Sequence, residues 1–358
     1  MNILFVRRYT NEVGGGTQIS NRNLSVLKSI YGNENVDIYD VKGTTRRVFT
    51  LYHRCIKHYI NGLSSTDVKA ISQDTNNYDF IWIDNSCFGA ICKILKDNGY
   101  KGLIAIFFHN IEYRFIQRPL LQCLLSFFFH RPIKLAEKKG ASYADITFVL
   151  THRDKCEVNK LSQKANIIII PSSLPDTYIG NCIFLRDNTN YKTLNLLFVG
   201  SYFFANVNGI TWFINEVLPY VNARLTVVGS NMNKLPFKNS DKLEILGFVD
   251  DIGTYYQKAD CVIAPIFEGS GMKTKTTEAL MWGKYIIGTE EAFCGFEIND
   301  EVGISCHNSD SFIHAIEQFR LCHDGKSKFN VDSRNLYLEK YSLSSSERVV
   351  KDAMNKIS

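Results

Sequence analysis

Short apolar runs alternate with amphipathic stretches along almost the whole chain. Runs of four to eight apolar residues between polar, Gly or Pro positions are typical of buried strands. In the first half such runs cover 2–6, 36–39, 78–84, 101–108, 146–150 and 167–170, and in the second half 194–200, 223–229, 243–246, 261–264 and 285–288. Helical patterns lie between most of them, among them 46–71, 88–96, 252–258 and 344–357. This alternation predicts an α/β protein with a mostly parallel, doubly wound sheet in each half.

The length of 358 residues exceeds one ordinary hydrophobic core and favours two domains. Pro171, Pro175 and a polar tract at 187–190 mark a connector between the two series of strands. We therefore predict an N-terminal domain over 1–175 and a C-terminal domain over 176–340. The helix expected in 341–358 is predicted to cross back to the N-terminal domain.

Composition and cysteine usage favour a protein of the reducing cytosol. Hydrophobic residues make up 45% of the chain and charged residues 22%, as in soluble globular proteins. The ten cysteines show no Cys-x-x-Cys or zinc-ligand spacing. The apolar run 3–6 before Arg7-Arg8 is too short for a signal peptide, and no run is long enough to span a bilayer. We expect a cytoplasmic protein.

Positive charge is concentrated in the first half of the chain. The formal net charge is +5, and residues 1–180 hold 23 Lys and Arg against 15 Asp and Glu. Basic residues flank the strongly apolar segment 119–139, which favours either a helix at an anionic membrane surface or a core helix with solvated basic ends. The basic residues form no dense stripe and no nucleic-acid-binding motif, so no nucleic acid partner is expected.

A Gly-rich turn, Gly269-Ser270-Gly271, separates the strand 261–264 from a helix predicted over 272–282. Backbone amides at such a turn and the helix dipole favour a bound anion such as phosphate. Lys273 and Lys275 add mobile positive charge, and the Glu278 carboxylate could accept two ribose hydroxyls. Taken alone, a Gly-x-Gly before a helix is more often an ordinary turn, which is the alternative interpretation.

The first half has two further candidate sites at strand ends. Gly14-Gly15-Gly16 follows the first strand, where a triple glycine indicates a tight turn or close approach of a ligand. A simple loop is the alternative. His109-Asn110-Ile111-Glu112 follows the apolar strand 101–108, and open α/β sheets bind ligands at the carboxyl ends of their strands. A structural histidine is the alternative for His109.

In combination these features resemble the donor-binding domain of retaining, GT-B-fold glycosyltransferases, especially glycosyltransferase family 4, the glycosyl transferases group 1. The first half resembles the same family in its Gly-rich turn and its His109–Glu112 motif. The matching segments of the second half are Phe198-Val199-Gly200-Ser201, Asn206 before a helix, Leu246-Gly247-Phe248-Val249-Asp250-Asp251, Ala259-Asp260, Ala264-Pro265, 269–280 and Trp282-Gly283-Lys284.

The resemblance implies two Rossmann-like domains facing a cleft, with a nucleotide sugar bound to the second. Glu278 would bind the ribose, and His109 would hydrogen-bond the donor sugar near the reacting carbon. The diphosphate would be held by the amides of Gly269, Ser270 and Gly271 with Lys275 or Lys273, beside Gly200 and Ser201. Gly15 and Gly16 would lie by the diphosphate or the acceptor.

Two departures from the family pattern affect these assignments. Many relatives carry two glutamates separated by seven residues, whereas Glu268 and Glu278 are separated by nine and Ser270 takes the first glutamate's place. Glu268, the second catalytic candidate, would contact the sugar from another point or face solvent. The loop after Gly200 lacks the Arg of many relatives, which leaves the lysines to neutralise phosphate. No Asp-x-Asp motif ends a strand, so no metal is expected.

The resemblance predicts a metal-independent retaining glycosyltransferase without a cofactor, since the nucleotide diphosphate sugar is its substrate. The acceptor would be a glycan or lipid-linked hydroxyl in cell-surface polysaccharide synthesis, reached from the inner face of the membrane. A sugar-nucleotide epimerase of the same fold and a non-catalytic sugar-nucleotide-binding subunit are the alternatives. An NAD-dependent enzyme is disfavoured because no Gly-x-Gly-x-x-Gly follows the first strand.

Overall fold

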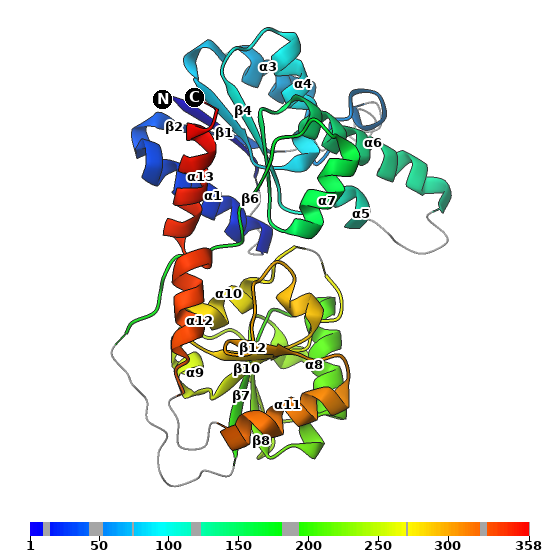
Figure 1. Cartoon of the computed structure of the whole chain (residues 1–358). Helices are drawn as coiled ribbons and strands as arrows, with labels where there is room; N and C mark the ends of the chain where they lie inside the picture. Colours follow the sequence, from blue (N-terminus) through cyan, green and yellow to red (C-terminus); the bar gives the residue numbers. More distant parts are fainter. Residues whose placement is uncertain are drawn as a thin grey trace. The chain divides into compact units, whose positions relative to one another are not determined.

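The computed structural model describes residues 1–9, 15–42, 53–73, 75–115, 123–180, 193–269, 271–322 and 328–357. The chain forms two compact units, which are described separately below (Figure 1). The first unit comprises Met1–Pro171 together with Ser346–Ser358, and the second comprises Ser172–Ser345.

The first unit contains a six-stranded parallel sheet in the order β2-β1-β3-β4-β5-β6. The chain runs outward from β1 to β2 and then returns to the other side of β1 for β3, so the strand order reverses between β1 and β3. Ligands of open α/β sheets bind outside the carboxyl ends of the strands at such a reversal. The strands are β1 (Ile3–Arg8), β2 (Val36–Val41), β3 (Phe80–Ile83), β4 (Leu103–Phe108), β5 (Ile146–Val149) and β6 (Ile167–Ile169).

Helices surround this sheet, and the last helix of the chain packs with them. Figure 1 shows α13 beside α1, and the Arg22 guanidinium of α1 donates a hydrogen bond to Ser346 Oγ of α13. Trp82 of β3 is fully buried and stacks on Phe148 with ring centres 4.8 Å apart. The helices are α1 (Gly15–Tyr31), α3 (Ser65–Gln73), α4 (Ala90–Asp97), α5 (Glu112–Phe115), α6 (Cys123–Tyr143), α7 (His152–Leu161) and α13 (Leu343–Asn355).

The irregular helical pattern noted over 46–71 forms two separate helical elements in its described part. A π-helical turn, η2 (His53–Lys57), is separated from α3 by a non-helical segment. His58 and Asn61 in that segment have φ angles of 60° and 52°. Left-handed backbone cannot continue a right-handed helix, so the helical pattern of side chains is interrupted there.

The second unit contains another six-stranded parallel sheet, in the order β12-β11-β10-β7-β8-β9. The predicted α/β class, with a parallel doubly wound sheet in each half, is therefore confirmed. The strands are β7 (Leu194–Val199), β8 (Ala223–Val228), β9 (Leu243–Ile245), β10 (Cys261–Ala264), β11 (Tyr285–Gly288) and β12 (Gly303–Ser305), and the helices are α8 (Phe204–Glu216), α9 (Gly253–Lys258), α10 (Thr274–Met281), α11 (Ser309–Cys322) and α12 (Val331–Leu336).

Two short elements of this unit were not predicted. The edge strand β12 has three residues, too few for a period-2 pattern to stand out. The helix α12 has six residues and continues into a π-helical turn, Tyr337–Tyr341. Both are stabilised by neighbours that are distant in sequence: β12 pairs with β11, and the Ser333 hydroxyl of α12 donates to the Lys284 carbonyl.

Among the described helices, none combines the length and the apolar character that crossing a bilayer requires. The longest, α6, has 21 residues and contains Pro132. In its described second half, Ile133 and Ala136 are buried in the core of the first unit, whereas Arg131, Lys134 and Lys138 are exposed. That half of α6 is a core helix with a solvated basic face. The side chains of 119–129 lie outside the described residues.

Candidate functional site

The Gly-rich turn lies between β10 and α10, as expected. Gly269 and Gly271 have φ angles of +151° and +62°, which glycine adopts without the strain that a side chain would bring. Helix α10 begins after Lys273, and the side chain of this N-cap residue makes no capping hydrogen bond. The first amides of α10 are therefore available to an anion. Ser270 lies outside the described residues.

Lys275, in the first turn of α10, is the principal cation of this site. Its Nζ lies 2.5 Å from Asn206 Oδ1 and 4.4 Å from the centre of the Phe198 ring. No described carboxylate forms an ion pair with Lys275. The residue is half-buried, and desolvation of the ammonium lowers its pKa to about 7, although Glu278 raises the pKa in part. Among the described residues, this cation therefore has no anionic partner within contact distance.

Gly200, directly after β7, lies close to this lysine because it has no side chain. A Cβ on Gly200 would lie 3.0 Å from both Lys275 Nζ and Asn206 Nδ2, so a larger residue would push these groups apart. Asn206 Nδ2 donates to the Ser201 carbonyl at 2.8 Å, which fixes the loop after β7. Gly200, Ser201 and Lys275 therefore form one cluster through Asn206. The sequence motif contained Asn206 but did not indicate this bridging role.

Lys273 is placed differently from Lys275. Its Nζ forms an ion pair with Glu291 Oε1 at 2.7 Å and donates to the Gly271 carbonyl at 2.9 Å. The expectation of mobile charge at Lys273 is therefore not met in this structure. Glu291 lies in a 3-10 helix, Glu290–Phe293, after β11, and nothing in the sequence spacing of 18 residues indicated the pair. Of the two lysines, Lys275 is the one that has no carboxylate partner in the described part of the chain.

Glu278 lies one turn after Lys275 on α10. Burial raises the pKa of Glu278, against the effect of a hydrogen bond from Tyr256 and of the Lys275 charge. Tyr256 Oη lies 3.3 Å from Glu278 Oε2, and the fully buried Tyr256 ring stacks parallel to Trp282 at 5.9 Å. The carboxylate is thus oriented by an aromatic pair and keeps its second oxygen for another donor. No sequence motif indicated this role of Tyr256.

Glu268 does not join this cluster through any described contact. The residue is exposed, and no hydrogen bond or ion pair of Glu268 is found in the described parts of the chain. Its neighbour Phe267 packs edge-on against Trp212, with ring centres 4.8 Å apart. Glu268 therefore faces solvent at the rim of the Gly-rich turn.

His109 lies in the first unit, directly after β4. Its Nε2 is 2.9 Å from the Asp84 carbonyl oxygen and 3.2 Å from Asp84 Oδ2. The other ring nitrogen, Nδ1, is buried and has no hydrogen-bond partner among the described residues. Gly15 and Gly16 begin α1, and a Cβ on Gly16 would meet no atom within 4 Å, so the backbone is accessible there. Gly14 lies outside the described residues.

The loop that carries His109 is fixed by Glu137 of α6. This fully buried carboxylate accepts hydrogen bonds from Ser86 Oγ at 2.9 Å and from the Glu112 and Tyr113 amides at 2.9 and 3.2 Å. Burial raises the pKa of Glu137 to about 7, although these hydrogen bonds lower it in part. Glu137 thus caps the N-terminus of α5. In the sequence it is one charge among several in an amphipathic segment.

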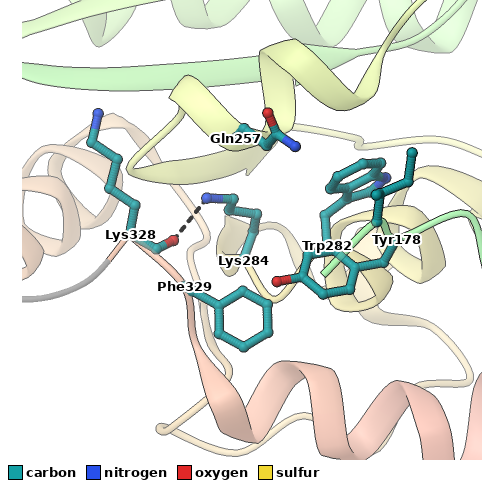
Figure 2. A pocket seen from close by; sticks show the side chains of 7 residues that line it. Tyr178, Gln257, Trp282, Lys284, Lys328 and Phe329 are labelled. Atoms are coloured by element: carbon teal, nitrogen blue, oxygen red, sulfur yellow. Dashed lines mark hydrogen bonds between the residues drawn. The ribbon is translucent and has the colours of Figure 1, made fainter. Parts of the chain in front are cut away.

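A small cavity in the second unit lies beside Trp282, the residue that follows α10 (Figure 2). Its volume of about 20 Å³ suits roughly one water molecule. Lys284 Nζ donates there to the carbonyls of Lys328 and Ala259 at 2.7 and 2.9 Å. These bonds tie together segments distant in the sequence, so Lys284 is explained structurally. The cavity is lined by Tyr178, Ile179, Gln257, Trp282, Lys284, Lys328 and Phe329.

The two doubly wound parallel sheets, with a Gly-rich turn opening a helix in the second, define the GT-B class of α/β proteins. Comparison with solved structures confirms this class over the full length of the chain. The sequence of the second unit is more specific: residues 193–320 match the family model described as glycosyl transferases group 1. The resemblance noted from the sequence motifs is therefore confirmed.

Three solved structures illustrate the likeness, which at these identities concerns the fold. Sucrose-phosphate synthase from Thermosynechococcus elongatus has a TM-score of 0.69 and 14% identity, with 100% of this chain and 99% of that chain covered. The lipopolysaccharide outer core galactosyltransferase WaaB, in its apo form, has a TM-score of 0.68 and 13% identity, with both chains covered completely. Anabaena HepE in complex with UDP-glucose has a TM-score of 0.65 and 10% identity, with 99% of this chain and 100% of that chain covered. No curated protein sequence matches significantly.

Proposed function

We propose that this protein is a retaining glycosyltransferase that moves a sugar from a nucleotide diphosphate donor to a hydroxyl of a glycan or lipid-linked acceptor. Its place would be the synthesis of cell-surface polysaccharide at the inner face of the cytoplasmic membrane. The observation that carries the proposal is the half-buried Lys275 ammonium, which has no carboxylate partner among the described residues and lies beside the uncapped start of α10. A desolvated cation next to unpaired amides is stabilised by a bound anion.

In this proposal the diphosphate occupies the turn of Gly269, Ser270 and Gly271 and contacts Lys275, while Glu278 accepts the ribose hydroxyls. The Tyr256 hydrogen bond orients one oxygen of the Glu278 carboxylate and leaves the other for the nucleotide. HepE, which shares the fold, has been solved with UDP-glucose and with UDP, and this supports a nucleoside diphosphate as the leaving group.

The proposed chemistry needs positive charge where the sugar–phosphate bond breaks. As that bond breaks, its electron pair goes to the diphosphate, and the acceptor oxygen forms the new bond to the sugar while its proton passes to an oxygen of the leaving diphosphate. The Lys275 ammonium and the α10 amides stabilise the developing negative charge without requiring a metal. His109 hydrogen-bonds the sugar. The configuration of the anomeric carbon in the product, read by NMR, tests retention.

Membrane docking is the second part of the proposal, and it is supported by a basic cluster on the first unit. Lys139 and Arg131 of α6 add to the effect of burial in lowering the pKa of His58. After burial, the charges of Lys93 and Lys57 also lower the pKa of Lys139, whereas Asp97, which pairs with Lys93, raises it in part. These cations from α6, α4 and η2 are therefore close enough to repel one another, and Asp97 offsets part of that repulsion. Anionic headgroups or the phosphate of a lipid-linked acceptor relieve that repulsion.

Donor binding is tested by calorimetry with UDP, GDP and ADP and by thermal shift with their sugar derivatives. We expect one of these nucleotides to bind the wild-type protein, with Lys275→Met weakening binding at least about tenfold, because a charge-assisted hydrogen bond contributes about 1.5–3 kcal/mol. Glu278→Ala is expected to weaken nucleotide binding as well. The exposed Lys238, substituted Lys238→Met, is the matched control and should bind normally. Failure of the wild-type protein to bind any of the three nucleotides would refute the proposal.

Membrane docking is tested by co-sedimentation with vesicles containing anionic phospholipid. The variant Arg131→Glu/Lys134→Glu reverses two charges on the exposed face of α6, and we expect it to remain largely in the supernatant. The control Lys101→Glu/Lys164→Glu reverses the same number of exposed charges elsewhere on the unit. Equal sedimentation of both variants and the wild-type protein would contradict docking through α6.

A further inference from the structure

A buried polar cluster surrounds Asp84, just after the carboxyl end of β3. The Asp84 side chain is inaccessible to solvent. Its Oδ1 accepts hydrogen bonds from Asn23 Nδ2 at 2.6 Å and from Trp82 Nε1 at 3.0 Å. Its Oδ2 lies 3.2 Å from His109 Nε2. The cluster therefore lies at the reversal of strand order in the first unit, where open α/β sheets place their ligands.

The geometry determines which ring nitrogen of His109 carries the hydrogen. Nε2 faces two oxygens of Asp84, the backbone carbonyl at 2.9 Å and the carboxylate Oδ2. A carbonyl oxygen can only accept, so Nε2 must be the donor. In the neutral imidazole, Nδ1 then has no hydrogen and acts as an acceptor.

Nδ1 is also the atom of this histidine without a partner. It is buried, and no described residue donates a hydrogen bond to it. A buried acceptor without a partner destabilises the folded protein, so any group that supplies a donor there stabilises it. The hydroxyls of a sugar are such donors.

We propose that Asp84 is a positioning residue that fixes His109 in the Nε2–H tautomer, so that Nδ1 accepts a hydrogen bond from a hydroxyl of the transferred sugar. The identity of the hydroxyl donor rests on the proposed function, whereas the tautomer follows from the contacts of Asp84 alone. Asp84 acts through His109 and does not touch the sugar.

The positive charge of Arg22 on α1 helps to stabilise the Asp84 carboxylate in its buried position. The Arg22 guanidinium is buried, and its charge interacts with Asp84. Its Nη1 donates to Ser346 Oγ at 3.3 Å, and its central carbon lies 5.4 Å from the centre of the Phe107 ring. The Phe107 ring packs edge-on to His109 at 4.9 Å. A buried carboxylate is stable when a cation and several hydrogen-bond donors compensate it, and Asp84 has both.

The tautomer is measured on the free protein by two-bond ¹H–¹⁵N correlation NMR of samples labelled in histidine, with His109 assigned from the spectrum of His109→Asn. We expect the cross-peak pattern of an Nε2–H imidazole. An Nδ1–H pattern in the wild-type protein would overturn the proposal without reference to any substrate.

The variant Asp84→Asn reverses the hydrogen bond at almost unchanged volume. Because Oδ1 accepts from Asn23 and Trp82, the new amide keeps its oxygen there and turns its NH₂ group toward Nε2. Nε2 then faces one acceptor, the backbone carbonyl, and one donor instead of two acceptors, so we expect the Nε2–H preference to weaken and an Nδ1–H population to appear in the NMR spectrum. A spectrum of His109 identical to that of the wild-type protein would assign the tautomer to the carbonyl alone and overturn the role of the Asp84 side chain. The exposed Asp79, substituted Asp79→Asn, is the control and should leave the spectrum of His109 unchanged.

Kinetics with UDP-glucose as the probe separate positioning from binding. For Asp84→Asn we expect kcat to fall at least about tenfold, as for other histidines held in the wrong tautomer, while UDP affinity stays within about twofold. A variant that keeps wild-type kcat despite the altered tautomer would overturn the role of Asp84. If instead the wild-type protein bound no nucleotide, the proposed function would fail, and the NMR result would still decide the tautomer.

A second pair of variants keeps the test independent of how well Asp84→Asn folds. His109→Asn retains a polar atom near the position of Nδ1, whereas His109→Gln retains one near Nε2. We expect the asparagine variant to keep the higher kcat, because the sugar hydroxyl bonds at the Nδ1 position. Higher activity of the glutamine variant would show that Nε2 is the functional atom and would overturn the proposal.

Discussion

At the scale of single residues, Lys273 and Lys275 lie two positions apart but differ in how their charges are compensated. Both lysines follow the same glycines, but Glu291 pairs with Lys273 alone. Lys275 is left with an amide oxygen and an aromatic face as its neighbours. A cation in such surroundings loses hydration without gaining a counter-ion, so its affinity for protons falls and its affinity for an anion rises.

This arrangement predicts that nucleotide binding is coupled to proton uptake. The folded-state pKa of about 7 for Lys275 lies below the ordinary lysine value of 10.5, so at pH 8 the free protein carries less than a full proton there. A bound diphosphate raises the pKa and draws in up to about one proton. Calorimetry with UDP at pH 8 in HEPES and in Tris should therefore give different heats. Lys275→Met should remove that difference, and a difference that persisted in Lys275→Met would assign the proton elsewhere.

At the scale of secondary-structure elements, Glu137 connects α6 to the loop that carries His109. Its carboxylate replaces the missing hydrogen-bond acceptors at the start of α5, a helix of only four residues. Such a short helix gains little from its own hydrogen bonds, so a side chain from another helix determines where it begins. The cost is a carboxyl group in a fully buried position.

Burial of the Glu137 carboxyl group predicts that the free energy of unfolding depends on pH. The pKa of Glu137 is raised from 4.5 to about 7 in the folded protein, so the folded state binds more protons between these values. The stability that this group contributes is fully present below about pH 4.5 and is lost as the pH rises through 7, by about 3 kcal/mol in total. Denaturant unfolding of Glu137→Gln should lack this part of the pH slope. The exposed Glu216, substituted Glu216→Gln, should retain it, and identical slopes for wild type and Glu137→Gln would contradict the assignment.

At the scale of the whole molecule, the first unit is built from both ends of the chain. Residues 346–358 belong to it although the second unit precedes them in the sequence. On α13 the side chains of Val350, Ala353 and Met354 are buried, and Ser346 accepts a hydrogen bond from the buried Arg22. The core of the first unit is therefore completed only after the second unit has been synthesised.

We expect Val350→Asp to destabilise the first unit by about 3 kcal/mol or more, because a carboxylate would be buried without a partner. The neighbouring exposed Asp352, substituted Asp352→Ala, should have an effect below about 0.5 kcal/mol. Hydrogen exchange read by mass spectrometry locates the loss of protection. Peptides from β1 and β3 should exchange faster in Val350→Asp, whereas peptides from β7 and β10 should not. Loss of protection confined to the second unit would contradict this placement of α13.

The sequence by itself determined the α/β class, nearly every strand and the Gly-rich turn before α10. These features depend on local patterns: apolar runs of strand length, glycines where the backbone needs positive φ, and periodic helices. Local patterns did not show β12 and α12, which are too short to have one, nor the break at His58 and Asn61.

Only the tertiary structure decided which charges in the candidate site are compensated. Glu291 lies 18 residues from Lys273, Asn206 lies 69 residues from Lys275, and Asp84 lies 25 residues from His109. Each pair forms because parallel strands bring their carboxyl ends to one edge of a sheet, whatever their separation in the chain. The sequence named Lys273, Lys275 and His109 as candidates, but their charge and hydrogen-bonding state depends on partners that only folding brings within 3.2 Å.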